Sequence, residues 1–600
     1  MRQQIIHQIL IALVAAVVFF TNLGAAGLWD MDEALYSACA REMLARGDWV
    51  VPVFNGEMFP DKPPLMFWLM MAGMALFGET EFAVRFFSAV FGIATALLTY
   101  HIGRLLFRPA VGFWAGLIMA SNIIFTISAR AATVDAALGF ATALAMFFLV
   151  VGALKAQAAA EGDATAGGDR TAVPFWPASW IWFALCYAAV GLAVLAKGPI
   201  GVILPVVVMG LFLLISTGPA LSAPVASPRR WLAWAIWALR LFSPANIGRI
   251  VWCMRPVTAV AVVGAVALPW YILVTLRTGG AWIVDFLTNY NLGPFVEPIL
   301  GHTGPVWYHL VSVAVGFFPW SIFIWPAILV ACRRLRYDDP QRLPVLFAVA
   351  WFGGFMIFWS VCAMKLPHYI LPAYPALAML TGLFIDEWMA EPARFSRVWM
   401  RYAAGVFFFA GAGLLVVMPV VASIFVPGEW MLGLVGLLLL AGGLAGLVFS
   451  ERLQPRATLF VYVVTSAAFV TAVFAFAALG VDRHQDGRKL FAAFHARGAN
   501  VGDLVTYRFF RESYVYYAGQ PVSHCGSFAE LSAKAAAEGP LKVLTLNKYE
   551  GEIHEAFPGQ FEILAREPRF LHPDETVVIL ARRPAEAVQT AERPRNTLRP

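Results

Sequence analysis

The sequence predicts a polytopic α-helical membrane protein that ends in a small α/β domain. Hydrophobic residues make up 60% of the 600 residues, and charged residues only 13%. Apolar runs recur as far as residue 481, and a bilayer crossing takes roughly 20 apolar residues. After residue 481 the apolar runs shorten and alternate with helical stretches, which is typical of a small α/β domain. This composition excludes an ordinary soluble enzyme.

Thirteen apolar runs are candidate transmembrane spans. They lie at residues 5–27, 82–106, 110–128, 132–153, 179–196, 199–217, 256–276, 306–331, 343–361, 368–387, 399–425, 430–449 and 456–481. The first is expected to be a retained span, because no small-residue cleavage site precedes the acidic loop that follows it. Arginine and lysine are concentrated in alternate loops, so the positive-inside rule places the N-terminus inside and the chain after residue 481 outside.

The predicted domains follow from this topology. Residues 1–481 form the transmembrane domain with a first outer loop at 28–81, residues 482–585 form an outer α/β domain, and residues 586–600 form a disordered tail. The net charge of +6 is spread over short loops rather than gathered in a patch, so a nucleic-acid partner is not expected. The six cysteines show neither a disulfide framework nor metal-ligand spacing.

The first outer loop is unusually acidic for so apolar a chain. Its segment "LWDMDEALYSACAREMLARGDWVVPVFNGEMFPDKPPLMFW" covers residues 28–68. In one interpretation Asp30 and Glu33 form a capping box, and the acids of the first turn merely start a helix that runs to about Arg46. In the other, Asp32 and Glu33 belong to a functional site, because ionisable groups beside apolar spans usually mark one.

Other polar residues lie at span ends on the same predicted outer face. They are Arg130, Asp135, Lys197, His302, Lys365 and His368. Mixed acids and cations at one lipid–water boundary favour a site for a lipid that carries a phosphate. A transporter or lipid flippase, the alternative from another class, would need polar groups at the bilayer midplane and on both faces. A structural scaffold would leave these residues without a purpose.

Group transfer from a lipid-phosphate carrier fits this set of residues. A leaving phosphate needs cations, which Lys62, Lys197 and Lys365 are placed to supply. An acceptor hydroxyl needs a carboxylate to take or orient its proton, and Asp32 or Asp135 can do either. An acceptor phosphate is already ionised and would need orientation only. No phosphate-binding loop or dinucleotide motif is present, so neither ATP nor a dinucleotide is expected to be used directly.

Several segments resemble a known family. The first outer loop, "SARAATVDAALGFATALAMF", "LAKGPIGVILP" and "MKLPHYILPAYPALAML" look like the polyprenyl-phosphate-sugar-dependent glycosyltransferases of the GT-C class. The likeness is greatest to the bacterial 4-amino-4-deoxy-L-arabinose transferases (glycosyltransferase families 39 and 83), relatives of the protein O-mannosyltransferases, and extends to about residue 390. It implies a GT-C fold and an inverting transfer from undecaprenyl phosphate. The site and the C-terminal domain would face the periplasm from the bacterial inner membrane.

The resemblance also implies residue roles. Asp32 matches the catalytic or acceptor-orienting acid, Glu33 its partner, Asp135 the second acid, and Lys62 the lysine that holds the carrier phosphate. Further candidates are Lys197, Lys365 and Arg130 for the carrier phosphate, and Tyr36, His368 and Tyr369 for substrate contact. The acceptor would be lipid A phosphate or another envelope glycolipid, with a protein side chain as the alternative.

A zinc site is implied less directly. The family usually has Glu-Lys-Pro where this chain has Asp61-Lys62-Pro63, and that glutamate can hold zinc together with a histidine of a later outer loop. Asp61 and His302 are the corresponding candidates here.

Simpler structural roles stay open for some of these residues. Arg130 and Asp135 could form a structural pair, and Lys197 could extend along its helix to the membrane surface. His368 and Tyr369 could anchor a span at the interface.

Overall fold

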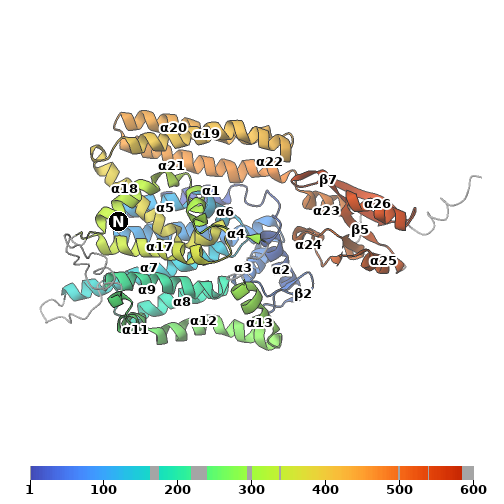
Figure 1. Ribbon diagram of the computed structural model, residues 1–600, viewed down its shortest axis with the longest axis horizontal. Helices are drawn as coiled ribbons and strands as arrows, with labels where there is room; N and C mark the ends of the chain where they lie inside the picture. The colour runs from blue at the N-terminus through green and yellow to red at the C-terminus, as the bar shows by residue number, and fades with distance from the viewer. Residues whose placement is uncertain are drawn as a thin grey trace, which may run out of the picture.

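The computed structural model describes residues 2–162, 175–217, 239–293, 301–336, 339–496, 501–537 and 539–583. It shows a bundle of long helices with a small sheet domain at one end (Figure 1). The N-terminus lies at the opposite end of the bundle (Figure 1), as an odd number of crossings requires.

Ten helices of the described chain are long and apolar enough to cross a membrane. They comprise α1 (Arg2–Phe20), α4 (Glu81–Leu106), α7 (Asp135–Gly162), α8 (Trp180–Lys197), α12 (Pro256–Arg277), α17 (Arg342–Val361), α18 (Tyr374–Ala390) with the preceding turn η4 (Pro367–Ala373), α19 (Val398–Phe425), α20 (Gly436–Glu451) with the preceding turn η6 (Trp430–Val435), and α21 (Pro455–Thr471), which continues through η7 (Ala472–Ala477) into α22 (Ala478–Asp482). The predicted multi-pass membrane architecture is therefore confirmed.

Two predicted straight spans are bent. The pair α5 (Pro109–Met119) and α6 (Ile123–Arg130) turns by 64°, and α15 (Tyr308–Gly316) turns by 114° into η3 (Trp320–Phe323) and α16 (Ile324–Arg334). At the first bend the Asn122 side chain accepts a hydrogen bond from the Phe125 amide and so starts a new helix within the apolar run. The remaining predicted span is the 17-residue helix α9 (Ile200–Ser216).

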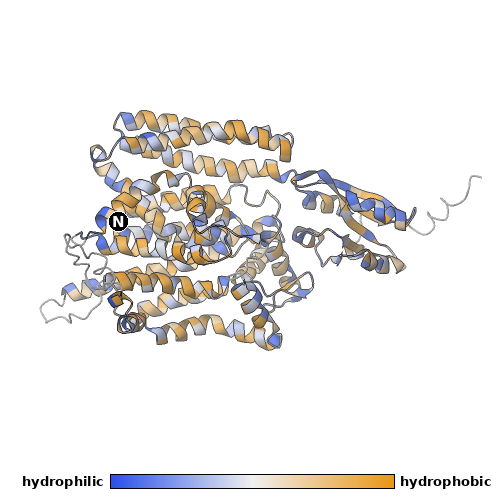
Figure 2. Ribbon diagram, viewed as in Figure 1, coloured by the Kyte–Doolittle hydropathy of each residue, from blue (hydrophilic) through white to orange (hydrophobic). Residues whose placement is uncertain are grey.

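Packing within the bundle relies on small residues, and its outer surface is apolar. A Cβ atom on Gly112 of α5 would lie 2.3 Å from the Tyr100 carbonyl oxygen of α4, so only glycine allows this close approach. Figure 2 shows apolar residues along the bundle helices and more hydrophilic residues in the terminal domain. Large apolar side chains on the outer surface, such as Phe409 at 73% exposed, suit contact with lipid.

The first outer loop folds into α2 (Asp32–Arg46), the two-residue strands β1 (Val53–Phe54) and β2 (Glu57–Met58), and the short apolar helix α3 (Leu65–Phe77). Helix α2 ends at Arg46 as expected, and Gly47 adopts the left-handed conformation (φ 62°) that closes it. The capping box of the first interpretation does not form, because Met31 is the N-cap residue and no side chain caps the helix.

The C-terminal domain is a mixed five-stranded sheet with helices. The strand order is β4 (Ser523–Cys525), β3 (Leu504–Tyr507), β5 (Lys542–Leu546), β7 (His572–Arg582) and β6 (Phe561–Arg569). Strands β4, β3 and β5 are parallel, and β7 pairs antiparallel with both β5 and β6. Helices α23 (Asp486–Ala496), α24 (Glu512–Ala518), α25 (Phe528–Ala536) and α26 (Asn547–Ala556) connect and cover the strands. The predicted α/β fold is confirmed, and the predicted tail at 586–600 lies outside the described residues.

This domain is docked on the first outer loop. The Arg41 guanidinium of α2 donates hydrogen bonds to the carbonyl oxygens of Val515, at 2.7 Å, and of Tyr516. Asn55 donates to the Val522 carbonyl at 3.0 Å and accepts from the Val522 amide at 2.7 Å. Because all of these side chains or amides are at least partly buried, the loop and the domain form one unit at this end of the bundle.

Candidate functional site

Eight of the predicted site residues form one cluster, here called the acid–lysine cluster. Its members are Asp32, Tyr36, Asp61, Lys62, Asp135, Lys197, His368 and Tyr369. They come from the first outer loop, from the adjoining ends of α7 and α8, and from η4. Span ends that are far apart in the sequence therefore meet on one face of the bundle.

The outer-loop half of the cluster is a chain of short contacts. Lys62 Nζ donates a hydrogen bond to Asp61 Oδ1 at 2.5 Å. The Tyr36 hydroxyl lies 3.3 Å from Asp61 Oδ2 and 3.2 Å from Asp32 Oδ1, so it can donate to either carboxylate. Asp32 is exposed, whereas the Tyr36 side chain is only 1% exposed. Tyr36, predicted to contact substrate, is therefore placed to orient the two carboxylates.

The other half is built on Asp135, the first residue of α7. Lys197 Nζ, at the end of α8, donates to Asp135 Oδ1 at 2.6 Å, and His368 Nε2 lies 3.8 Å from Asp135 Oδ2. The Lys197 ammonium also lies 4.9 Å from the centre of the Tyr369 ring, a cation–π contact. The structural Arg130–Asp135 pair that the sequence left open is not formed, because Lys197 is the partner of Asp135.

Carboxylates from both halves of the cluster act on the Lys62 ammonium. Burial by itself would lower the pKa of the Lys62 ammonium, but the Asp61 carboxylate, with smaller contributions from Asp32 and Asp135, raises this pKa above its ordinary value. Lys62 therefore stays protonated near neutral pH. An ammonium has three N–H donors. Asp61 accepts from two of them, through Oδ1 and through its carbonyl oxygen at 3.5 Å, so one remains for an incoming anion.

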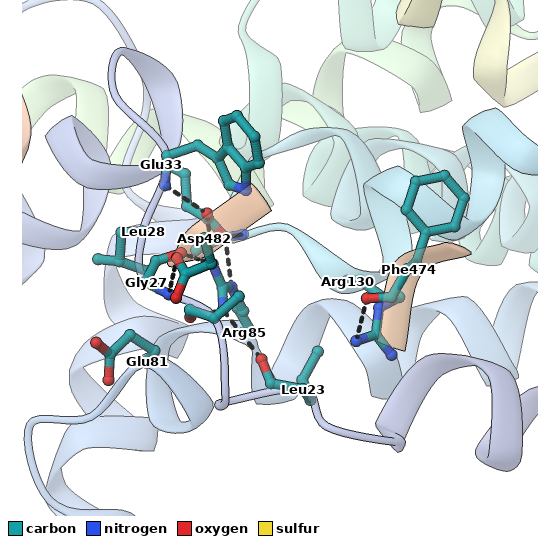
Figure 3. A network of polar contacts seen from close by, with 12 residues as sticks. Leu23, Gly27, Leu28, Glu33, Glu81, Arg85, Arg130, Phe474 and Asp482 are labelled. Atoms are coloured by element: carbon teal, nitrogen blue, oxygen red, sulfur yellow. Dashed lines mark hydrogen bonds and ion pairs between the residues drawn. The ribbon is translucent and has the colours of Figure 1, made fainter. Parts of the chain in front are cut away.

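Glu33, expected to be the partner of Asp32, lies in a separate buried network (Figure 3). Arg85 Nε donates to Glu33 Oε1 at 2.6 Å and Arg85 Nη2 to Oε2 at 2.7 Å. The Ala132 and Trp29 amides donate to the same two oxygens, at 2.9 and 3.0 Å. Burial alone would raise the pKa of Glu33, but Arg85 and these hydrogen bonds hold that pKa below its ordinary value. With both oxygens fully engaged, Glu33 has a structural place and offers no free oxygen to a substrate.

Two predicted phosphate ligands are also engaged elsewhere. Arg130 donates to the carbonyl oxygens of Val18 and Phe19, each at 3.0 Å, and to that of Phe474 at 3.1 Å; the last contact is drawn in Figure 3. Lys365 is 4% exposed and donates to three carbonyl oxygens at the end of α17, those of Trp359, Ser360 and Cys362, at 2.5–2.9 Å. All three N–H donors of Lys365 are thus used, and none remains for a phosphate.

The residues present do not fit the implied zinc site. Asp61 already faces the Lys62 ammonium, a cation at the place where a metal would bind, and its other oxygen contacts the Tyr36 hydroxyl. The backbone carbonyl oxygen of His302 accepts from the Lys365 amide at 2.9 Å, and no hydrogen bond or ion pair joins the His302 side chain to Asp61 among the described residues. Over the described residues no group of three or more His, Cys, Asp or Glu side chains is arranged to hold a metal.

Sequence reasoning missed the role of Arg85 and the proximity of Tyr290 to the cluster. The partner of Arg85 lies 52 residues away, so no local spacing reveals the pair. Tyr290 in the π-helix η1 (Thr288–Leu292) lies near the cluster, since burial and then the Asp61 carboxylate raise the pKa of its hydroxyl. For Arg85 the available signal was an arginine within an apolar segment, where it needs a partner. No signal in the sequence pointed to Tyr290.

The sequence was compared with known proteins and families. Residues 5–284 match the family model described as dolichyl-phosphate-mannose-protein mannosyltransferase. An uncharacterized protein of Aquifex aeolicus (strain VF5) is 25% identical over 389 residues, 63% of this chain and 64% of its own length. A Serratia proteamaculans (strain 568) protein named undecaprenyl phosphate-alpha-4-amino-4-deoxy-L-arabinose arabinosyl transferase is 28% identical over 457 residues, 74% of this chain and 71% of that protein. The match thus spans less than two thirds of the Aquifex protein.

A solved structure shares the whole fold. The crystal structure of ArnT from Cupriavidus metallidurans bound to undecaprenyl phosphate superposes with a TM-score of 0.71. The superposition covers 96% of this chain and 98% of that chain at 22% sequence identity. It includes the C-terminal sheet domain as well as the membrane helices, so the two chains share one architecture from end to end.

Proposed function

We propose that this chain is a membrane glycosyltransferase of the GT-C class and that it transfers a sugar from undecaprenyl phosphate to a lipid acceptor at the periplasmic face of the bacterial inner membrane. The observation that carries this proposal is the acid–lysine cluster. Two lysines and an exposed carboxylate converge where the first outer loop meets the ends of α7 and α8. The name of the Serratia relative supports the choice of carrier.

In the proposed reaction, Lys62 and Lys197 hold the carrier phosphate and Asp32 receives the acceptor. The acceptor oxygen attacks the anomeric carbon of the sugar, and the bond from that carbon to the phosphate oxygen breaks. The bonding electrons leave with the phosphate, whose developing charge the two ammonium groups stabilise. A hydroxyl acceptor passes its proton to Asp32. A phosphate acceptor is already ionised, and Asp32 then orients it. Lipid A phosphate is the acceptor that we propose.

The test of this function is a transfer assay combined with mass spectrometry. Membranes from cells that make the protein should show a sugar-sized mass increment on lipid A, and the purified protein should reproduce it from an undecaprenyl-phosphate-linked sugar. An increment on a protein instead of a lipid would replace the proposed acceptor. Transport of the carrier lipid across vesicles without any transfer would contradict the enzymatic proposal altogether.

Replacing Lys62 by glutamine is expected to lower kcat/KM for the donor about a hundredfold, because a preorganised cation facing the leaving phosphate is lost. Steady-state kinetics at varied donor concentration measures this. The matched control is Lys489→Gln, which removes an exposed lysine of α23 at the same end of the molecule. If the two variants behaved alike, Lys62 would have no part in phosphate binding.

Chelation of divalent metals is expected to leave the transfer rate unchanged, because Lys62 already occupies the cationic position beside Asp61. The measurement is the rate after treatment with EDTA and gel filtration, with and without added zinc. A tenfold loss that zinc restores in the unmodified chain, but not in Asp61→Asn, would instead establish a metal site at Asp61.

A further inference from the structure

A cavity of about 640 Å³ lies between the first outer loop and the last membrane helices. Its apolar wall comes from α19, η6, α21, η7 and α22, and includes Leu414, Met418, Val435, Phe469, Val473 and Ala477. Its polar wall comes from the loop and from α4 and α6, and includes Asp30, Asp32, Glu33, Arg85 and Arg130. This volume is within the usual range for small-molecule sites, about 300–1,000 Å³.

The cavity runs from the polar end of the bundle into the membrane region. Leu414 lies 11 residues before Phe425, the last residue of α19, which corresponds to roughly 16 Å at about 1.5 Å per residue. Met418 lies between them on the same helix. Asp32 and Trp29 mark the loop end of the cavity. An occupant would therefore have a polar group near Asp32 and a hydrocarbon portion along α19 and α21.

Of the three acids in the polar wall, only Asp32 lacks an ion-pair partner among the described residues. Glu33 is bonded to Arg85, Asp30 lies 3.2 Å from Arg511, and Arg130 donates to backbone carbonyls, as Figure 3 shows for Phe474. Asp32, in contrast, makes no ion pair with any residue that the structure describes. Arg130 likewise has no carboxylate partner among the described residues, so the wall offers one carboxylate and one cation to the polar group of an occupant.

Asp32 also separates this cavity from the phosphate-binding lysines. It touches Tyr36, which contacts Asp61 and through it Lys62, yet neither Lys62 nor Lys197 lines the cavity. Inversion at a sugar carbon requires the acceptor and the leaving group to lie on opposite faces of the ring. With the carrier phosphate on the lysine side of Asp32, the acceptor must come from the cavity side.

We propose that this cavity binds a hydrocarbon chain of the lipid acceptor, with the acceptor's polar group at Asp32. The proposal rests on the proposed function for the distinction between donor and acceptor. It commits to an acyl chain of the acceptor and not to the prenyl chain of the carrier, because the cavity opens on the acid and not on the lysines.

Photo-crosslinking tests the assignment without requiring turnover. The probes are lipid A with a diazirine on one acyl chain and an undecaprenyl phosphate with a diazirine on its prenyl chain, each added to the full-length protein in nanodiscs. Peptide mapping of the unmodified chain is expected to place the acyl probe at residues 414–418 and 469–481. Ala477→Trp should fill the cavity and reduce this labelling at least tenfold. The control Phe476→Trp changes a neighbouring side chain that is 58% exposed and does not line the cavity, and it should keep the labelling.

A kinetic split completes the test. Ala477→Trp is expected to raise KM for acylated lipid A at least tenfold and to leave KM for the donor within twofold. Labelling of these segments by the prenyl probe, or no labelling by either probe, would overturn the proposal. If the acyl probe labels the cavity but no sugar reaches any acceptor, the proposed function fails while the cavity remains an acyl-chain site.

Discussion

Replacing Asp32 by asparagine is expected to lower kcat for sugar transfer to a hydroxyl acceptor by about a hundredfold to ten-thousandfold, the range in which a general base acts. For a phosphate acceptor, which Asp32 only orients, the loss of kcat is expected to be smaller. The substitution keeps the size and one acceptor oxygen of the side chain but removes its charge and its ability to take a proton. Asp32 is exposed and makes no ion pair with any described residue, so the folded state should lose little stability. The measurement is kcat with both substrates saturating, together with the thermal unfolding midpoint in the same detergent.

Two further variants make this result interpretable. Glu57→Gln removes an exposed acid of the same outer loop and should leave kcat unchanged. Asp32→Glu keeps the carboxylate and should retain part of the rate. If Asp32→Asn turned over at the normal rate, Asp32 would merely favour the start of α2, and Asp135 would be the remaining candidate acid.

Replacing Arg85 by alanine is expected to destabilise the protein by about 3–5 kcal/mol, the usual cost of leaving a buried charge without its partner. Both side chains of the Arg85–Glu33 pair are 5% exposed. Arg85 also donates to the carbonyl oxygens of Leu23, Ala26 and Gly27, which connect α1 to the outer loop. Figure 3 draws the contact with Leu23. Its loss should therefore loosen the loop that carries Asp32 and Lys62. The thermal unfolding midpoint reports the destabilisation.

The control for Arg85 is a more exposed arginine at the same end of the molecule. Arg488 lies 3.9 Å from Glu81 and is 48% exposed, so Arg488→Ala should cost no more than about 1 kcal/mol. A double-mutant cycle with Glu33→Gln isolates the coupling within the buried pair. Because the pKa of Glu33 is lowered in the folded state, this stabilisation is present at neutral pH and is lost only when acid titrates the carboxyl through that lowered pKa. Loss of activity in Glu33→Gln at an unchanged unfolding midpoint would instead support a catalytic role.

The sequence alone was sufficient for the architecture and for most of the acid–lysine cluster. Hydropathy located the spans because a bilayer crossing requires a long apolar run. The same runs bring residues at their ends, such as Asp135, Lys197 and His368, to a common depth in the membrane, and those residues do meet. The helix of the first outer loop was also placed correctly to Arg46, where Gly47 permits the left-handed turn that ends it.

Only the tertiary structure decided which of these polar residues are engaged by other parts of the chain. Glu33, Arg130 and Lys365 lie at the expected depth, but each is engaged by groups from other segments or by a helix end. The bends at Asn122 and after Gly316 were likewise invisible in the hydropathy. The physical reason is that an apolar run determines where a residue lies along the membrane normal. The packing of helices decides the position of that residue within the membrane plane and the partner of its hydrogen bonds. These helices can be several hundred residues apart in the sequence, as the Arg130 contact with Phe474 shows.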